Sequence, residues 1–161
     1  MHLFLQKIDF SMEYDMKRIE NLNNELISKK IITENESKSI DLNKIYSFLN
    51  SDFVKRIKKS KEIKKEKAFC MEMDAKEFYD NVEDETILIQ GIIDLYYIDE
   101  NDNIVLVDYK TDYVKNENEL IDKYKVQLKI YKKALEKGLN KKVAQIYIYS
   151  LYLNKEISIK L

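Results

Sequence analysis

Two stretches of the sequence are rich in β-branched and aromatic residues, and a short polar segment separates them. The stretches are Thr86–Ile98 and Ile104–Tyr109, and the segment between them, Asp99–Asn103, consists of residues that favour tight turns. Loops of about this length commonly join the two strands of a hairpin. We therefore expect an antiparallel β-hairpin here, with its register centred on Asn101.

The hydrophobic pattern changes period along the rest of the chain. Apolar residues recur with helical spacing over about the first sixty residues, and they alternate over Phe69–Met73 as they do in a strand. Helical spacing returns over Glu117–Lys137, where Gly138 is placed to end the helix. Alternation returns over Val143–Leu153, and Glu156–Leu161 is expected to pair back against it.

This order of elements predicts an α/β fold in a single domain, residues 1–161, with a mainly helical part over 1–60 and an α/β core over 61–161. Apolar residues make up 45% of the chain and charged residues 35%, but the net charge is only -1. That balance excludes a polybasic arm, so a nucleic-acid site has to be a local patch. The basic segment Lys55–Lys67 is one candidate for phosphate contacts, and a solvated helix end is its other interpretation. The single cysteine, Cys70, and the lack of a membrane-length apolar run favour the cytoplasm.

Two aspartates and a lysine are the candidates for chemistry in the predicted hairpin. In the register centred on Asn101, Asp94 faces Asp108, and Lys110 points to the same face because it lies two residues further along the strand. Both aspartates adjoin apolar runs that are typical of strands covered on both faces. A buried carboxylate persists when it is paired, hydrogen-bonded or bound to a metal, and carboxylate oxygens suit Mg²⁺ or Mn²⁺. From spacing alone, the alternative that both aspartates face water beside a surface lysine stays open.

Several motifs resemble those of the RecB-like branch of the PD-(D/E)XK nuclease superfamily. The segment Gly91–Asp94 resembles its GxxD motif, and Asp108–Asp112, with the sequence DYKTD, resembles its catalytic strand motif. Gln127 and Tyr131, preceded by the aromatic Tyr124, resemble its Q-x-x-x-Y helix motif. Among the members of this branch, the resemblance is closest to the nuclease domains of AddA-type helicase–nuclease subunits.

Two further residues fit the same family pattern. Glu66 resembles the acidic residue before the family's first core strand, and His2 resembles the histidine on its first helix. The resemblance thus covers nearly the whole chain. It implies a restriction-endonuclease-like mixed β-sheet flanked by helices, with a helical N-terminal part. It also leads us to expect a domain excised from the C-terminus of a larger helicase/nuclease chain.

The resemblance implies a role for each matching residue. The metal ligands it implies are His2, Asp94, Asp108 and the backbone carbonyl of Tyr109. The catalytic residues it implies are Asp94, Asp108 and Lys110, of which the lysine orients or helps to deprotonate the attacking water. The residues it implies as supporting the site or contacting DNA are Glu66, Gln127, Tyr131 and Tyr124. The last three share one helix face by their spacing, and ordinary core packing is the alternative interpretation, above all for Tyr124.

The implied function is a metal-dependent DNA exonuclease. It would hydrolyse single-stranded DNA unwound by an attached helicase, in double-strand-break processing for recombinational repair, with Mg²⁺ as cofactor and Mn²⁺ as a substitute. ATP would bind to helicase domains of the same parent chain, because no G-x-x-x-x-G-K-[ST] phosphate loop occurs here. An AddB-like second subunit is the implied partner. A non-catalytic nucleic-acid-binding module on the same fold, and a stand-alone PD-(D/E)XK exonuclease, are the alternatives.

Overall fold

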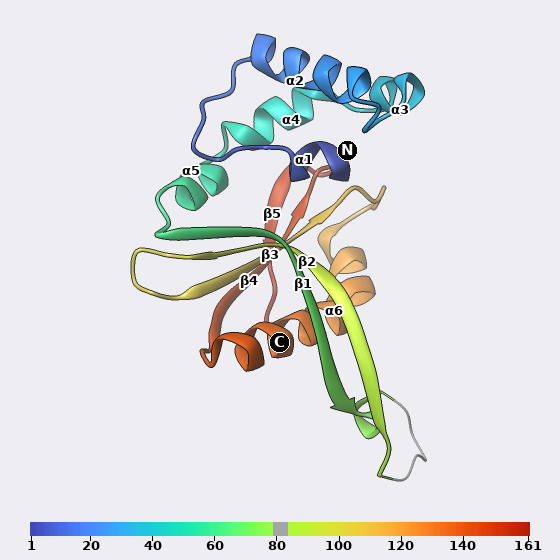
Figure 1. Ribbon diagram of the computed structural model, residues 1–161, viewed down its shortest axis with the longest axis vertical. Coiled ribbons are helices and arrows are strands. Elements are labelled where there is room, and N and C mark those ends of the chain that lie inside the picture. The colour runs from blue at the N-terminus through green and yellow to red at the C-terminus, as the bar shows by residue number, and fades with distance from the viewer. Residues whose placement is uncertain (79–83) are drawn as a thin grey trace.

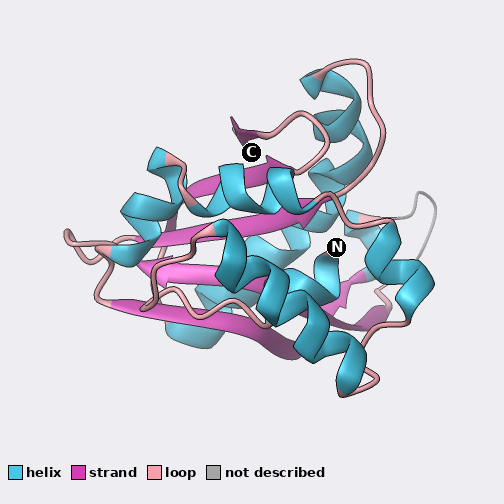
Figure 2. Cartoon of the chain, turned by 90° about the horizontal axis from the view of Figure 1, so that it is seen from above, coloured by secondary structure: helices cyan, strands magenta, loops and turns pink. Residues whose placement is uncertain are grey.

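A mixed five-stranded sheet lies between two helical layers in the computed structural model, which describes residues 1–78 and 84–161 (Figures 1 and 2). The strands are β1 (Glu62–Asp74), β2 (Thr86–Ile98), β3 (Ile104–Lys110), β4 (Val143–Ser150) and β5 (Lys155–Ser158), and they lie in the order β1-β2-β3-β4-β5. Only β3 and β4 are parallel, because a long helix crosses over between them. The expectation of a mixed sheet flanked by helices is confirmed.

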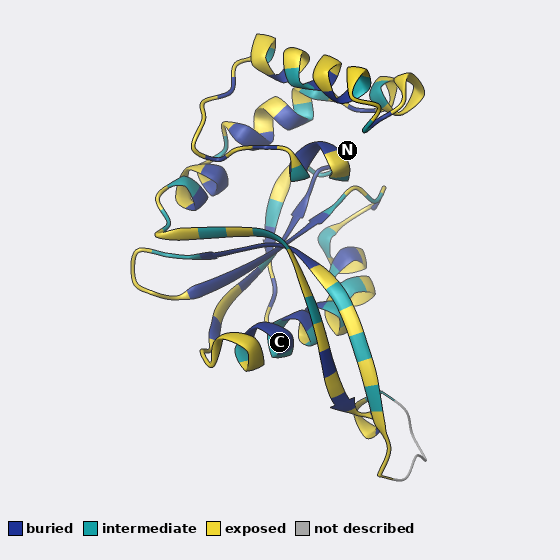
Figure 3. Cartoon of the chain, viewed as in Figure 1, coloured by how far each residue is buried: buried dark blue, intermediate teal, exposed yellow. Residues whose placement is uncertain are grey.

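Short helices with polar caps form the layer on one face of the sheet. They are α1 (His2–Gln6), α2 (Met16–Ser28), α3 (Glu34–Lys38), α4 (Leu42–Leu49) and α5 (Asp52–Lys58). Each helix after the first begins where a side chain accepts a backbone N–H, and Thr33 forms a capping box with Glu36. Their apolar faces meet one side of the sheet in a core that includes Phe4, Phe48 and Tyr149 (Figure 3).

Helix α6 (Glu117–Leu139) covers the opposite face. Its buried residues, among them Leu120, Leu128 and Leu135, pack against strands β3 and β4. The prediction that Gly138 lies beyond the end of this helix is wrong. Gly138 is still helical, and Asn140 ends the helix in the left-handed conformation with φ 49°. Asparagine tolerates that conformation better than other residues with a side chain.

Strand β2 joins two ladders, and the predicted hairpin is one of them. Its pairs with β3 run from Ile98–Ile104 to Leu95–Val107, which is the register centred on Asn101. On its other side, β2 pairs with β1 from Glu62–Ile98 to Asp74–Thr86, so the two strands form a long hairpin that extends beyond the body of the domain (Figure 1). The short helix η1 (Ala75–Glu77) follows β1. None of the helices in the described residues is long and apolar enough to cross a membrane.

Candidate active site

The ladder between β2 and β3 stops one pair before Asp94 and Asp108. At this point a side chain replaces a backbone carbonyl as the hydrogen-bond acceptor. Oδ2 of Asp94 accepts a hydrogen bond of 2.8 Å from the N–H of Tyr109. The two aspartates are therefore not a regular cross-strand pair, contrary to the simple register argument. Both of them nevertheless line a single cavity of about 620 Å³ at this end of the ladder.

The ladder between β1 and β2 is interrupted at the same level. Lys65 pairs with Leu95 and Lys67 with Ile93, but Glu66 and Asp94 between them do not pair. The backbone of Glu66 is left-handed, with φ 51°, a conformation that is strained for a residue with a side chain. Burial, reinforced by the charge of Asp94, raises the pKa of Glu66 above its ordinary value. The strand thus departs from regular geometry at an acidic residue that borders the cavity.

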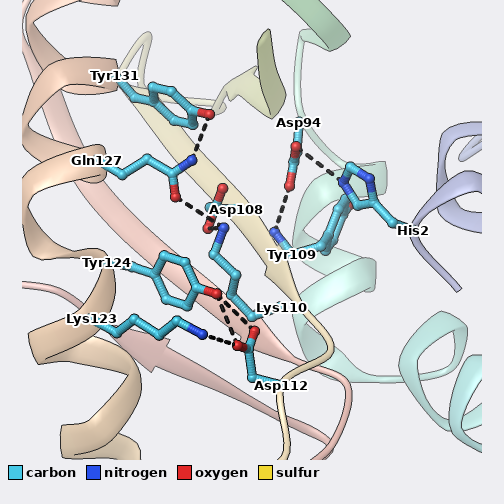
Figure 4. A network of polar contacts seen from close by, with 10 residues as sticks. All are labelled: His2, Asp94, Asp108, Tyr109, Lys110, Asp112, Lys123, Tyr124, Gln127 and Tyr131. Atoms are coloured by element: carbon cyan, nitrogen blue, oxygen red, sulfur yellow. Dashed lines mark hydrogen bonds and ion pairs between the residues drawn. The ribbon is translucent and has the colours of Figure 1, made fainter. Parts of the chain in front are cut away.

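Helix α1 brings His2 to these carboxylates. The Nε2 atom of His2 lies 3.1 Å from Oδ1 of Asp94 (Figure 4). This hydrogen bond raises the pKa of His2, although partial burial acts in the opposite direction. The helix is held to β1 near its C-terminal end. Lys65 donates to the carbonyls of Gln6, at 3.0 Å, and of Ile8, and the side chain of Gln6 donates to Glu66 at 2.9 Å.

The donor atoms of three residues are close enough together to hold a divalent cation. One ligand atom from each of His2, Glu66 and Asp94 lies within 4.8 Å of the others. One imidazole nitrogen and carboxylate oxygens fit Mg²⁺ or Mn²⁺. Glu66, which was expected to support the site or contact DNA, belongs to this compact group, whereas the side chain of Asp108 does not. Asp108 still borders the same cavity, as does Tyr109.

A second polar chain connects Asp108 to helix α6. The Nζ of Lys110 lies 2.6 Å from Oδ2 of Asp108 and donates to Oε1 of Gln127 at 3.0 Å, and Gln127 donates to the hydroxyl of Tyr131 at 2.8 Å (Figure 4). Asp108 is only 1% exposed. Burial raises the pKa of Asp108 to about 6, although Lys110 acts in the opposite direction. The predicted shared face of Asp108 and Lys110 is confirmed.

Tyr124 closes the side of the cavity next to this lysine. The Nζ of Lys110 lies 4.0 Å from the centre of the Tyr124 ring. The Tyr124 hydroxyl donates to both carboxylate oxygens of Asp112, at 3.0 and 2.9 Å. Lys123 also pairs with Asp112, and this hydrogen bond lowers the pKa of Asp112. Sequence reasoning assigned no role to Asp112, although it lies in the DYKTD motif. Its contact with α6 depends on how the loop after β3 folds, which residue spacing does not specify.

Much of the basic segment Lys55–Lys67 is engaged with neighbouring groups. Its ion pairs are Lys55–Asp52, Arg56–Glu156, Lys58–Glu13, Lys61–Asp102 and Lys64–Glu62. Such pairing reduces the positive charge that the segment can offer to a phosphate. The cavity between α1 and α6 is therefore the stronger candidate for the functional site.

Known proteins resemble this chain over nearly its whole length. Residues 1–159 match the model of the PD-(D/E)XK nuclease superfamily. An ATP-dependent helicase/nuclease subunit of Clostridium novyi (strain NT) is 39% identical over 99% of the chain. Its counterpart in Clostridium kluyveri (strain NBRC 12016) is 42% identical over 92%, and that of Thermoanaerobacter pseudethanolicus is 37% identical over 98%. The chain spans only 12 to 13% of the length of these relatives.

Proposed function

The chain belongs to the PD-(D/E)XK nuclease superfamily, and we propose that it is a metal-dependent deoxyribonuclease domain that hydrolyses phosphodiester bonds of single-stranded DNA. The observation that carries the proposal is the convergence of two groups on one cavity. The donor group His2, Glu66 and Asp94 lies on one side, and the pair Asp108–Lys110 lies on the other. A bound cation and a cationic side chain can each stabilise the charge that develops on a scissile phosphate.

A divalent cation, when bound, would offset charge on the phosphate and lower the pKa of the attacking water. We propose Mg²⁺, with Mn²⁺ as a substitute, because most of the donors are oxygens. His2, Asp94, Asp108 and the carbonyl of Tyr109 are the proposed ligands, and the position of Glu66 adds it to this set.

Lys110 is the proposed catalytic cation of the protein itself. Gln127, braced by Tyr131, fixes its ammonium group from one side, and the ring of Tyr124 contacts it from another. A lysine that is held in this way donates its remaining N–H to the attacking water or to a phosphate oxygen without losing further side-chain freedom. Asp108, whose Oδ2 lies 2.6 Å from the ammonium group, helps to orient the lysine.

A cleavage assay with one matched control tests this function. The purified chain is incubated with end-labelled single-stranded DNA in Mg²⁺, in Mn²⁺ and in EDTA. Lys110→Ala is expected to lower the rate by about a hundredfold or more, the usual effect of removing a positioned charge-stabilising group. Lys123→Ala removes a lysine from the other side of Tyr124 and is expected to retain the rate within a few fold. Cutting in EDTA, or equal losses in both variants, would contradict the proposal.

The relatives support a proposal for the wider role. Their name describes a subunit of an ATP-dependent helicase/nuclease, and the chain corresponds to a small part of them. We propose that this chain is the nuclease domain, residues 1–161, of such a protein, excised from its C-terminus, and that ATP binds to the helicase part and not here. The proposed task is to process double-strand breaks for recombination in the cytoplasm, with an AddB-like second subunit. Because Asp94, Asp108 and Lys110 are all present, a catalytic role is favoured over a binding module that has lost its ligands.

A further inference from the structure

A pair of tyrosines, exposed Tyr113 and half-buried Tyr152, has no part in the chemistry described so far. Tyr113 has the greatest exposed fraction, 79%, among the exposed large hydrophobic side chains of the described residues. On one side its ring contacts the ring of Tyr152, with 4.6 Å between the centroids and 54° between the planes. An aromatic ring this exposed is a ready contact for a ligand with a flat apolar face.

The loop that carries Tyr113 is anchored on both sides of it. Asp112, just before it, is bound by Tyr124 and Lys123 of helix α6. Val114, just after it, is buried in the core between α6 and the sheet. The ring of Tyr113 is therefore presented by a fixed backbone, which reduces the ordering cost that binding would otherwise carry.

Tyr152 provides a firm support for Tyr113. It is half-buried and packs against the same α6-face core. The ammonium group of Lys44, from helix α4, lies 4.6 Å from the centre of its ring and donates to its backbone carbonyl at 2.8 Å. The pair thus has a cation on its inner tyrosine and an open face on its outer one, a combination that suits an anionic strand carrying flat bases.

The position of the pair relative to Lys110 points to the ligand. Tyr113 is three residues after Lys110, so their Cα atoms are at most about 11 Å apart, at about 3.8 Å per residue. The two side chains add to that distance, and Asp112, the residue before Tyr113, lines the cavity, so the ring lies within several nucleotides of Lys110 at the duplex spacing of about 3.4 Å. Bases in a duplex are already stacked on one another, whereas bases of a single strand are free to stack on an aromatic ring.

We propose that Tyr113, backed by Tyr152, is a stacking platform for a nucleobase of single-stranded DNA next to the scissile phosphate. This inference rests on the proposed nuclease function and adds to it the means by which the site selects single strands. Stacking on an aromatic face makes no use of base identity, so the platform holds DNA of any sequence.

Binding measured without cleavage tests the platform separately from catalysis. Fluorescence anisotropy in EDTA gives the Kd of a labelled single-stranded oligonucleotide and of one of equal length made of abasic nucleotides, which keeps every phosphate. Tyr113→Ala is expected to raise the Kd of the intact oligonucleotide by about 5-fold to 150-fold, the range for loss of one stacked base, while Tyr113→Phe stays within about twofold. The abasic oligonucleotide is expected to bind Tyr113→Ala and the unchanged protein equally. Tyr46→Ala, at an exposed tyrosine of α4, serves as the control.

Each other outcome overturns the platform. If Tyr113→Ala binds the intact oligonucleotide as tightly as the unchanged protein does, no base stacks on Tyr113 and the proposal is refuted. If Tyr113→Ala loses the same affinity for the abasic oligonucleotide, the substitution affects a contact with the DNA backbone and not with a base. If the unchanged protein does not bind single-stranded DNA, the proposed stacking platform is refuted. A failure of the nuclease function itself would appear separately, as no metal-dependent cleavage by the unchanged protein.

Discussion

Replacing Asp108 by asparagine is expected to stabilise the metal-free protein while abolishing cleavage. The carboxyl group is 1% exposed, and burial raises its pKa from 3.8 to about 6 in spite of Lys110. The shift is about 2 units, and each unit corresponds to about 1.4 kcal/mol, so the ionised group lowers the free energy of unfolding by about 3 kcal/mol at neutral pH. Asparagine has nearly the same size and removes that charge.

The expected gain depends on pH in a defined direction. Between about pH 4 and pH 6 the folded state holds a proton on Asp108 that the unfolded state has lost, so the free energy of unfolding of the unchanged protein rises as the pH falls through this window. The raised pKa of His2 acts in the same direction but at higher pH, because its extra stabilisation is present below its ordinary pKa of 6.5 and is lost as the pH rises above that value. The advantage of Asp108→Asn over the unchanged protein should therefore be largest above pH 6 and disappear below about pH 4.

Urea unfolding followed by circular dichroism in EDTA, at pH 7.5 and at pH 4, measures this difference. Asp112→Asn is the matched control, because its hydrogen bond with Lys123 lowers the pKa of Asp112 and its ionised form stabilises the fold. The control is expected to lose stability at pH 7.5, opposite to Asp108→Asn. Added Mn²⁺ should stabilise the unchanged protein more than Asp108→Asn. A clear loss of stability of Asp108→Asn at pH 7.5 in EDTA would refute the reasoning.

Three further substitutions test how the site is supported. Lys65→Met removes the donor that holds helix α1, and calorimetric titration is expected to show about 10-fold to 100-fold weaker Mn²⁺ binding with an unchanged circular dichroism spectrum. An unchanged Mn²⁺ affinity would mean that the helix does not need the hydrogen bonds of Lys65. Gly91→Ala would place a Cβ 2.8 Å from Cε1 of Phe69, so urea unfolding should show a free energy of unfolding lower by about 1–3 kcal/mol. Adding Phe69→Leu should recover part of that loss, and a loss that the second change leaves unaffected would exclude this clash as its cause. Gln127→Ala frees the catalytic lysine on one side, and steady-state kinetics should show kcat about 10-fold to 100-fold lower with KM nearly constant; a rise in KM alone would instead assign Gln127 to DNA binding.

The hairpin and its register were predictable because they depend on local signals. The runs of β-branched and aromatic residues over Thr86–Ile98 and Ile104–Tyr109, with the turn residues between them, predict which residues face each other. The pairs from Ile98–Ile104 to Leu95–Val107 confirm this. The shared face of Asp108 and Lys110 follows directly from the two-residue period of a strand.

Other features depend on contacts between distant parts of the chain, and the sequence pattern did not reveal them. The ladder stops at Leu95 because the side chain of Asp94 takes the N–H of Tyr109, which no period or propensity encodes. Similarly, the left-handed backbone of Glu66 is compatible with its position only because strand β1 and helix α1 hold it there. The end of α6 was misplaced for a simpler reason, since both Gly138 and Asn140 are able to end a helix, and spacing does not choose between them.

Two of the departures from regular pairing occur at the carboxylates, and this explains how a sheet can contain such a site. If the two registers continued unbroken, Glu66 would pair with Asp94 and Tyr109 with Ile93. The acidic side chains would then lie in a regular sheet among apolar neighbours, where an unpaired charge is costly. With the Glu66–Asp94 pair released and the N–H of Tyr109 bonded to a side chain, these residues line a cavity instead. One oxygen of Asp94 then fixes the strand and the other faces His2, so a single residue both maintains the fold and presents a ligand. The position of the active site within the sheet is thus a consequence of where its ladders are interrupted.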